Sequence, residues 1–255
     1  MKKALSLVLA LVMVLMISAV FAAAKAPVVY VTIANGELVL VREKITLKDV
    51  DGDGALTIYD ALYLAHEAKY KGGAAAGFGT ATGDYGLYIS KLWGVENGGS
   101  YGYFLNDASA YGLTEPLTDG DELYAFVYTD ATYFTDAYSY FDVKQGKNSV
   151  ELTFYVGSYD ENWNTVFTAT EGAEITIDGV ATGIKTNRNG RATVSVDTAG
   201  THVVSATLEG ALIVPPVCTL KKSATPAAGD TGIIVLAIAG VISLAAFGMI
   251  KGKKA

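Results

Sequence analysis

Two long apolar stretches lie near the ends of the sequence, and a fold exposed to water is expected in the residues between them. Residues 1–24 begin with two lysines, continue with an apolar core and end in alanines, which is the pattern of a cleaved secretory signal peptide. Residues 232–250 carry no charge and are followed at once by the lysine-rich tail 251–255. At about 1.5 Å per residue, this segment nearly covers the ~30 Å hydrocarbon core of a membrane. The sequence therefore predicts an N-terminal signal peptide and a C-terminal transmembrane helix.

The lysines after the second apolar stretch predict how the chain lies in the membrane. By the positive-inside rule, the tail 251–255 is cytoplasmic and residues 25–230 are extracellular. The predicted location is the cell surface, as a single-pass membrane protein with an extracellular N-terminal region. Residues 223–231 are mostly small, which indicates a linker between the folded part and the membrane.

The same C-terminal order of short motif, apolar span and basic tail resembles a Gram-positive cell-wall sorting signal. Residues 225–229 read TPAAG and keep the proline and the final glycine of the Leu-Pro-x-Thr-Gly motif. The resemblance implies covalent attachment to the cell wall as an alternative to a retained membrane helix.

The region between the two apolar stretches is strongly acidic. Five of the 19 Lys and Arg residues lie in the ends, whereas all 26 Asp and Glu lie in this middle region, which leaves it 14 basic residues and a formal charge of −12. This balance excludes a nucleic-acid-binding protein that works through a basic face. One cysteine excludes an intrachain disulfide, and with only two histidines a His/Cys zinc site is nearly excluded.

The first predicted domain, residues 27–142, mixes strands with one helix. Asn35-Gly36 separates two β-rich runs, which is a strong hairpin signal. Residues 57–70 show the 3/4 apolar spacing of an amphipathic helix. The Gly/Ala-rich segment 71–84 is expected to be a mobile loop, and three strands are expected at 86–93, 100–105 and 122–129. A hairpin, a helix and further strands is the order of an α+β domain of the β-grasp type.

The twelve residues 49–60 carry the sharpest motif in the sequence. Acids occupy positions 1, 3, 5 and 12 and glycine occupies position 6, which is the pattern of an EF-hand calcium loop. Ca²⁺ prefers six to eight hard oxygen ligands, and a tightly wound loop points alternate residues inward. The predicted calcium ligands are Asp49, Asp51, Asp53, Ala55 through its carbonyl, Thr57 through a water, and Asp60. The alternative is an acidic turn in which Thr57 and Asp60 form only a helix capping box.

Two family resemblances cover this first domain. Residues 49–68, DVDGDGALTIYDALYLAHEA, resemble one repeat of a dockerin, which implies calcium binding at the six residues above. Residues 85–128, with YGLYISKLWG, GSYGYFLND and LTDGDELYAFVY, resemble the transcobalamin-like C-terminal β-grasp domains of secreted bacterial proteins.

The second predicted domain, residues 143–222, is all β. Strands are expected at 149–156, 174–177, 191–196 and 201–208, separated by glycine-containing turns at intervals typical of a β-sandwich. The phrases GAEITIDG, NGRATV and GTHVVSA resemble bacterial Ig-like domains of surface proteins. Such a module would space the first domain from the membrane.

Sequence motifs for catalysis are scarce. His66 and Glu67 begin an HExxH-like sequence, but the second histidine is missing, and we expect His66 on the exposed face of its helix. The predicted function is therefore non-enzymatic: a bacterial cell-surface binding or adhesion protein with calcium as a structural ion and an unknown extracellular protein or glycan as partner. The alternative is a surface receptor for a small ligand or glycan that uses the Tyr-rich face of the first domain. The aromatic strip 130–141 fits either an exposed binding surface or the interface between the domains.

Overall fold

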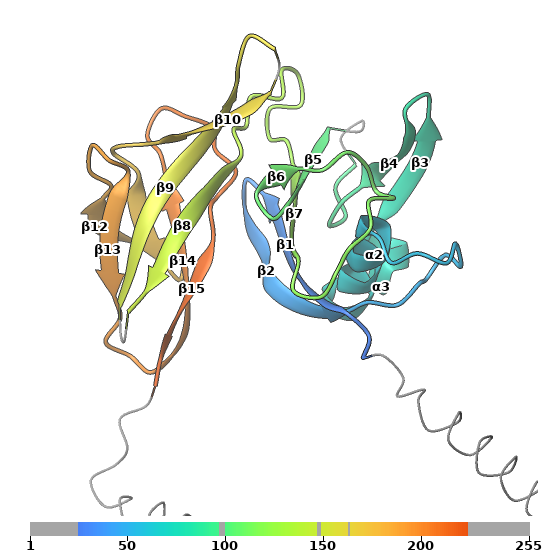
Figure 1. The fold of residues 1–255 in the computed structure, drawn as a ribbon, viewed down its shortest axis with the longest axis horizontal. Helices are drawn as coiled ribbons and strands as arrows, with labels where there is room; N and C mark the ends of the chain where they lie inside the picture. The colour runs from blue at the N-terminus through green and yellow to red at the C-terminus, as the bar shows by residue number, and fades with distance from the viewer. Residues whose placement is uncertain (1–24, 97–99, 147–148, 163, 224–255) are drawn as a thin grey trace, which may run out of the picture.

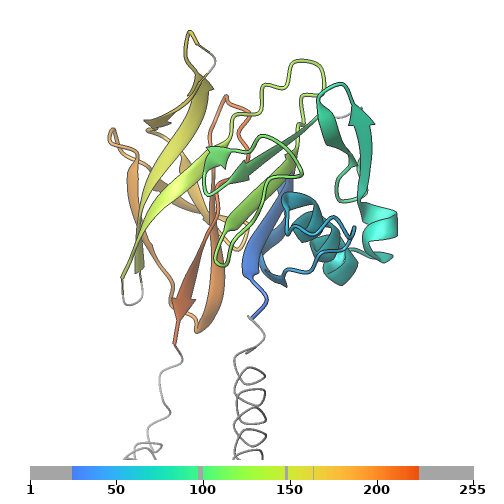
Figure 2. The same cartoon turned by 45° about the vertical axis from the view of Figure 1, so that its right-hand side comes forward.

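The structure, a computed structural model, describes residues 25–96, 100–146, 149–162 and 164–223. Two lobes lie side by side in both views: a first lobe that contains β1 to β7, and a second lobe that contains β8 to β15 (Figures 1 and 2). The described chain enters the first lobe and leaves the second lobe at the same end of the molecule (Figure 1).

The first lobe is built on a five-stranded sheet in the order β2-β1-β7-β5-β6. Its strands are β1 (Val28–Asn35), β2 (Glu37–Thr46), β5 (Tyr101–Leu105), β6 (Ala108–Ser109) and β7 (Glu122–Val127). The predicted hairpin is confirmed, because β1 and β2 pair antiparallel around Gly36, whose φ of 69° suits glycine. The central pair β1 and β7 is parallel, which joins segments far apart in the sequence.

The two faces of this sheet bury different partners because side chains alternate along each strand. On β7, Leu123, Ala125 and Val127 pack into the core beneath helix α2 (Ile58–Lys69). The intervening Tyr124 and Phe126 belong to a separate cluster on the side of the second lobe. The sheet therefore separates the helix from the second lobe, an arrangement that Figure 1 shows directly.

The predicted helix is confirmed almost to the residue, since α2 has Thr57 as its N-cap and Tyr70 as its C-cap. The prediction of a mobile loop at 71–84 is wrong. This segment contains a short helix, α3 (Gly73–Gly77), and strand β3 (Gly79–Gly83), which pairs with β4 (Gly86–Lys91). The Glu67 carboxylate accepts a hydrogen bond from the Ala74 backbone N–H at 2.9 Å, so α2 fixes the start of the segment that follows it.

The second lobe consists of two four-stranded antiparallel sheets around one apolar core. In the first sheet, β9 pairs with three other strands, and the members are β8 (Ser139–Gln145), β9 (Ser149–Tyr159), β10 (Thr165–Ala169) and β13 (Arg191–Ser195). The second sheet has the order β12-β11-β14-β15, with β11 (Glu174–Ile177), β12 (Val180–Lys185), β14 (Gly200–Thr207) and β15 (Cys218–Lys222). Strands β8, β10 and β12 were not expected from the sequence. Because β8 begins at Ser139, the predicted domain boundary between residues 142 and 143 falls inside this strand.

The two lobes are joined by hydrogen bonds as well as by apolar contacts. The connecting segment and the chain before β15 exchange backbone bonds: Ala137 N–H donates to Leu212 O, and Val214 N–H donates to Ala137 O, both at 2.9 Å. The Tyr124 hydroxyl donates to Pro215 O at 2.5 Å. Segments from both lobes therefore share one buried junction.

The predicted fold class requires a correction. Strands account for 51% and helices for 9% of the described residues, so the chain is mostly β rather than an α+β domain followed by an all-β sandwich. The reason is local: within the described residues, α2 alone combines helical apolar spacing with a cap, whereas the Tyr- and Gly-rich segments around it alternate and pair as strands.

The predicted single-pass membrane topology also requires a correction. No helix within the described ranges is long and apolar enough to cross a membrane. The longer described helix, α2, has 12 residues and spans about 18 Å, well short of the ~30 Å hydrocarbon core. The segments predicted as the signal peptide (1–24), the transmembrane helix (232–250) and the basic tail (251–255) lie outside the described residues, as does all but the first residue of the linker 223–231.

Candidate functional site

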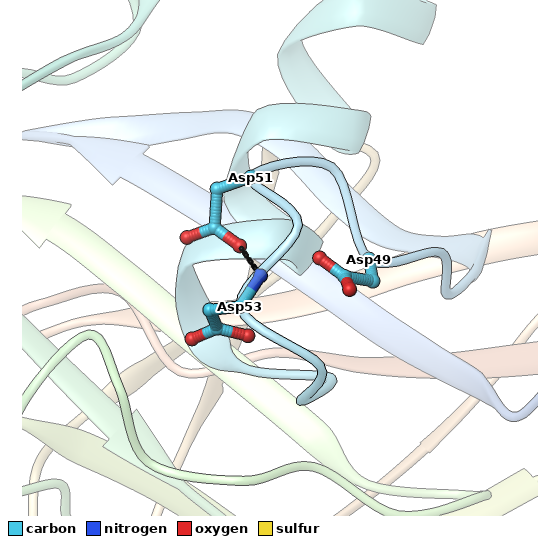
Figure 3. A group of neighbouring side chains, drawn as sticks. All are labelled: Asp49, Asp51 and Asp53. Carbon is cyan, nitrogen blue, oxygen red and sulfur yellow. Dashed lines mark hydrogen bonds between the residues drawn. The ribbon is translucent and has the colours of Figure 1, made fainter.

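The loop between β2 and α2 brings together three of the predicted calcium ligands. One carboxylate oxygen from each of Asp49, Asp51 and Asp53 lies within 4.8 Å of the others. Figure 3 shows the three side chains arranged around the turn. Gly52 and Gly54 have φ values of 79° and 87°, a left-handed conformation that glycine adopts without strain and that winds the loop tightly.

Backbone N–H groups of the loop hold these carboxylates in place. Asp49 accepts bonds from Gly52 N–H at 2.6 Å and Gly54 N–H at 3.0 Å. Asp53 accepts a bond from Ala55 N–H at 2.8 Å, and Asp51 accepts a longer one from Asp53 N–H at 3.3 Å (Figure 3). The donors are main-chain groups, so the carboxylates are positioned without a basic side chain to neutralise them.

Asp60 does not belong to this group. It is fully buried and its two oxygens accept hydrogen bonds from Val50 N–H and Thr57 N–H, each at 2.8 Å. The Thr57 hydroxyl donates to the same carboxylate at 3.0 Å. The last two side chains of the predicted ligand set therefore cap helix α2 and tie it to the start of the loop.

The acidity of the loop carboxyls reflects this arrangement. The N–H groups of Gly52 and Gly54 hold the pKa of Asp49 below its usual range. Desolvation raises the pKa of Asp51, and the neighbouring carboxylates of Asp53 and Asp60 raise it further. Like charges thus face one another in this loop. Its oxygen donors are the chemistry that a hard cation such as Ca²⁺ prefers, so the donor set fits the ion.

His66 lies where the sequence did not place it, and the expectation of an exposed histidine is wrong. Its side chain is fully buried, with its ring 5.1 Å from those of Phe78 and Trp93. The Nδ1 atom lies 2.6 Å from Leu62 O, and Nε2 accepts a bond from Trp93 N–H at 3.0 Å. These partners assign the neutral tautomer with the proton on Nδ1. Burial lowers the pKa of His66 to about 4.

The remaining histidine and the single cysteine of the sequence are His202 and Cys218. Burial raises the pKa of the Cys218 thiol to about 12, which keeps it protonated at neutral pH. The His202 ring contacts Asp178 Oδ2 at 2.7 Å, and this hydrogen bond raises the pKa of the histidine.

A polar cavity of about 250 Å³ lies between the lobes. Arg42, which has a left-handed φ of 42°, forms an ion pair with Glu122 at this cavity. Asp107 accepts a hydrogen bond from the Tyr138 hydroxyl at 2.8 Å. Desolvation raises the pKa of both Asp107 and Glu122, although Arg42 opposes the effect. The cavity therefore holds two acids and one base: Arg42 pairs with Glu122, and Asp107 is held by the Tyr138 hydroxyl.

The aromatic strip 130–141 divides between the two interpretations that the sequence left open. Tyr138 and Phe141 are buried, whereas Tyr133 and Phe134 are exposed. The ring of Tyr138 stacks on Phe104 of the first lobe, with centroids 3.7 Å apart. The strip is therefore an interface at its C-terminal end and a surface at its N-terminal end.

Comparison with known proteins adds no relative. No protein-family model matches the chain, no curated protein matches it, and no solved structure matches it. The likenesses to dockerins, to transcobalamin-like domains and to Ig-like domains therefore stay predictions from sequence alone.

Proposed function

We propose that the protein is a non-enzymatic binding protein whose first lobe is stabilised by a structural calcium ion. The observation that carries this proposal is the convergence of Asp49, Asp51 and Asp53 within 4.8 Å on a loop wound by two left-handed glycines. Three carboxylates at this distance repel one another, and a divalent cation bound between them would convert that repulsion into attraction. The remaining coordination positions would be filled by the Ala55 carbonyl and by water.

The position of the loop explains how such an ion would stabilise the fold. The buried Asp60 carboxylate connects Val50 at the start of the loop to Thr57 at the cap of α2. Ordering the loop would therefore order the first turn of the helix, which packs on the central sheet. Calcium would act on the whole lobe through this connection.

The state of two side chain types that often act in catalysis, the histidine His66 and the cysteine Cys218, supports binding rather than catalysis. His66 is neutral with both ring nitrogens in contact with backbone groups, and the Cys218 thiol is buried with a raised pKa. General acid–base catalysis requires a group that can exchange its proton with a substrate near the working pH, and neither side chain meets that requirement.

Thermal unfolding of the purified protein with calcium and with a chelator tests the calcium site. At a calcium concentration of 100 times Kd, binding to the folded state alone stabilises it by about 2.7 kcal/mol. Asp49→Ala should abolish this gain, because it removes a carboxylate from the group. Asp84→Ala, an exposed acid in the same lobe, should retain the gain. Equal melting temperatures with calcium and with chelator for the unmutated protein would refute the calcium site.

A further inference from the structure

A groove of about 420 Å³ lies where the chain crosses from the first lobe to the second. Its volume is in the range of pockets that hold small organic ligands, roughly 300–1,000 Å³. Rings of β5 and β7 and the buried Tyr138 line its inner side. Its outer side carries three exposed aromatic side chains: Tyr133, Phe134 and Tyr159.

The three outer rings expose aromatic surface together in one place. Tyr133 is 78% exposed, Tyr159 is 62% exposed and Phe134 is 51% exposed. Single exposed apolar side chains are normal, but a contiguous patch beside a groove marks a binding surface. The patch combines the second lobe with the segment that connects the lobes, because Tyr159 lies on β9 and the other two residues lie between β7 and β8.

The backbone of Phe134 is strained. Its φ is 55°, in the left-handed region that bulky residues rarely adopt. A hydrogen bond from its N–H to Asp130 O at 2.9 Å closes the turn that holds it there, and its ring lies 5.5 Å from that of Tyr128. Strained residues of this kind gather at ligand sites, where the surrounding structure enforces them.

Two carboxylates make the turn that carries these rings rigid. Asp130 accepts bonds from Tyr133 N–H at 3.1 Å and from the Thr135 hydroxyl at 2.7 Å. Asp136, which is buried, accepts bonds from both the backbone N–H and the hydroxyl of Thr129. The rings are therefore held in place before a ligand arrives, which lowers the entropy cost of binding.

The chemistry of the lining narrows the class of ligand. No Lys, Arg or His lines the groove among the residues that the structure describes, and its single acid, Asp136, is already engaged by backbone and hydroxyl donors. The groove therefore offers no charge to recognise a phosphate, a carboxylate or an amine. It offers flat aromatic faces together with the hydroxyl-bearing side chains of Thr135, Ser158 and Thr165.

We propose that this groove is a binding site for a neutral carbohydrate chain. A pyranose ring has one apolar C–H face, which suits an exposed aromatic ring, and hydroxyl groups around its edge, which suit hydroxyl and backbone partners. The proposal rests on the binding function proposed above and specifies its ligand. The groove is lined by Phe104 and Phe126 from the face of the sheet that is turned to the second lobe. The acidic loop leads into α2, which lies on the other side of that sheet (Figure 1). Sugar binding is therefore expected to persist when calcium is chelated.

Affinity electrophoresis of the purified protein in gels that contain soluble β-glucan, xylan, mannan or glycol chitin tests the proposal. At least one of these neutral polysaccharides should retard the protein. Tyr133→Ala and Phe134→Ala should each weaken that interaction at least tenfold. Both side chains are exposed, so the variants are expected to fold, and circular dichroism checks this. Tyr111→Ala is the matched control, because Tyr111 is 99% exposed but lies outside the groove, and it should bind like the unmutated protein.

Two outcomes would overturn the carbohydrate site: no retardation by any of the four polysaccharides, or equal retardation of the groove variants and Tyr111→Ala. Repeating the gels with chelator separates this proposal from the calcium site. A protein that shows no calcium-dependent melting but still binds sugar through Tyr133 would refute the calcium site and support the groove.

Discussion

Lowering the pH from 7 to 4.5 is expected to destabilise the protein through His66, in addition to any effect of its carboxylates. The folded state holds this histidine neutral, because Nδ1 lies on Leu62 O and Nε2 accepts a bond from Trp93 N–H. Protonation of Nε2 would place a second hydrogen against that N–H in a buried site. The unfolded chain has no such conflict and binds the proton with an ordinary pKa of about 6.5.

The magnitude follows from the difference between the two pKa values. The folded-state pKa of His66 is about 4, so the unfolded state binds more protons between pH 6.5 and pH 4. The contribution of the neutral histidine is complete above about pH 6.5 and is lost as the pH falls toward 4. A difference of this size is worth about 3 kcal/mol in total, of which about 2.5 kcal/mol is lost by pH 4.5.

Urea unfolding at a series of pH values, compared between the unmutated protein and His66→Phe, isolates this contribution. The variant keeps an aromatic ring among Phe78, Tyr70 and Trp93 but cannot bind a proton. Between pH 7 and pH 4.5 it should lose about 2.5 kcal/mol less free energy of unfolding than the unmutated protein.

Imidazole NMR gives an independent measurement, because the chain has only two histidines. His66 should stay in the neutral Nδ1–H tautomer down to about pH 5. His202 should titrate above pH 6.5, since its hydrogen bond to Asp178 raises its pKa. The stabilisation of the folded state by this protonated histidine is complete below pH 6.5 and disappears as the pH rises through the folded-state pKa. Two titrations near pH 6.5, or the same pH dependence in His66→Phe, would refute this reasoning.

Two further predictions concern the junction between the lobes. A side chain at Gly102 on β5 would collide with the ring of Phe126. Gly102→Ala should therefore lower the free energy of unfolding in urea by about 1–3 kcal/mol. Gly112 has open space around it, so Gly112→Ala should have little effect. Tyr138→Ala removes the ring that stacks on Phe104 and should cost about 3–5 kcal/mol. Tyr138→Phe keeps the stack, loses only the bond to Asp107 and should cost about 1–2 kcal/mol; equal losses in the two Tyr138 variants would show that the stack contributes nothing.

The parts of the fold that the sequence predicted well depend on neighbouring residues. The hairpin around Gly36 and the helix that begins after Thr57 are determined by turn chemistry, apolar spacing and a cap within a few residues. The turn-bounded strands of the second lobe were found for the same reason. The short strands β10 and β12 contain no fully buried residue, so no row of core side chains marks them, and they were missed.

The parts that the sequence could not predict depend on distant partners. His66 reads as a polar residue on a helix, and its burial follows from Phe78 and Trp93, which α3 and the β3–β4 hairpin bring over the helix. In the acidic loop, the twelve-residue pattern predicted six calcium ligands, whereas the structure brings together the carboxylates of three of these residues. Asp60 meets the needs of a helix cap as well as those of an ion, and no sequence spacing separates those two roles.

The parallel pair at the centre of the first lobe has a consequence for how the chain folds during synthesis. Tyr30 on β1 pairs with Glu122 on β7, 92 residues later. At a synthesis rate of about 5–20 residues per second, β7 is made on the order of ten seconds after β1. Until then, β1 and β2 lack the strand that completes their core. Throughout that interval one edge of β1 and its row of Val29, Val31 and Ile33 stay open to other chains. The aromatic face of β7 stays uncovered for longer, until Val214 and Pro215 have been synthesised and can pack on it. Truncated chains that end before residue 122 should therefore aggregate more than longer chains. Chains of different lengths can be released from ribosomes in a cell-free system, and the insoluble fraction of each can be measured.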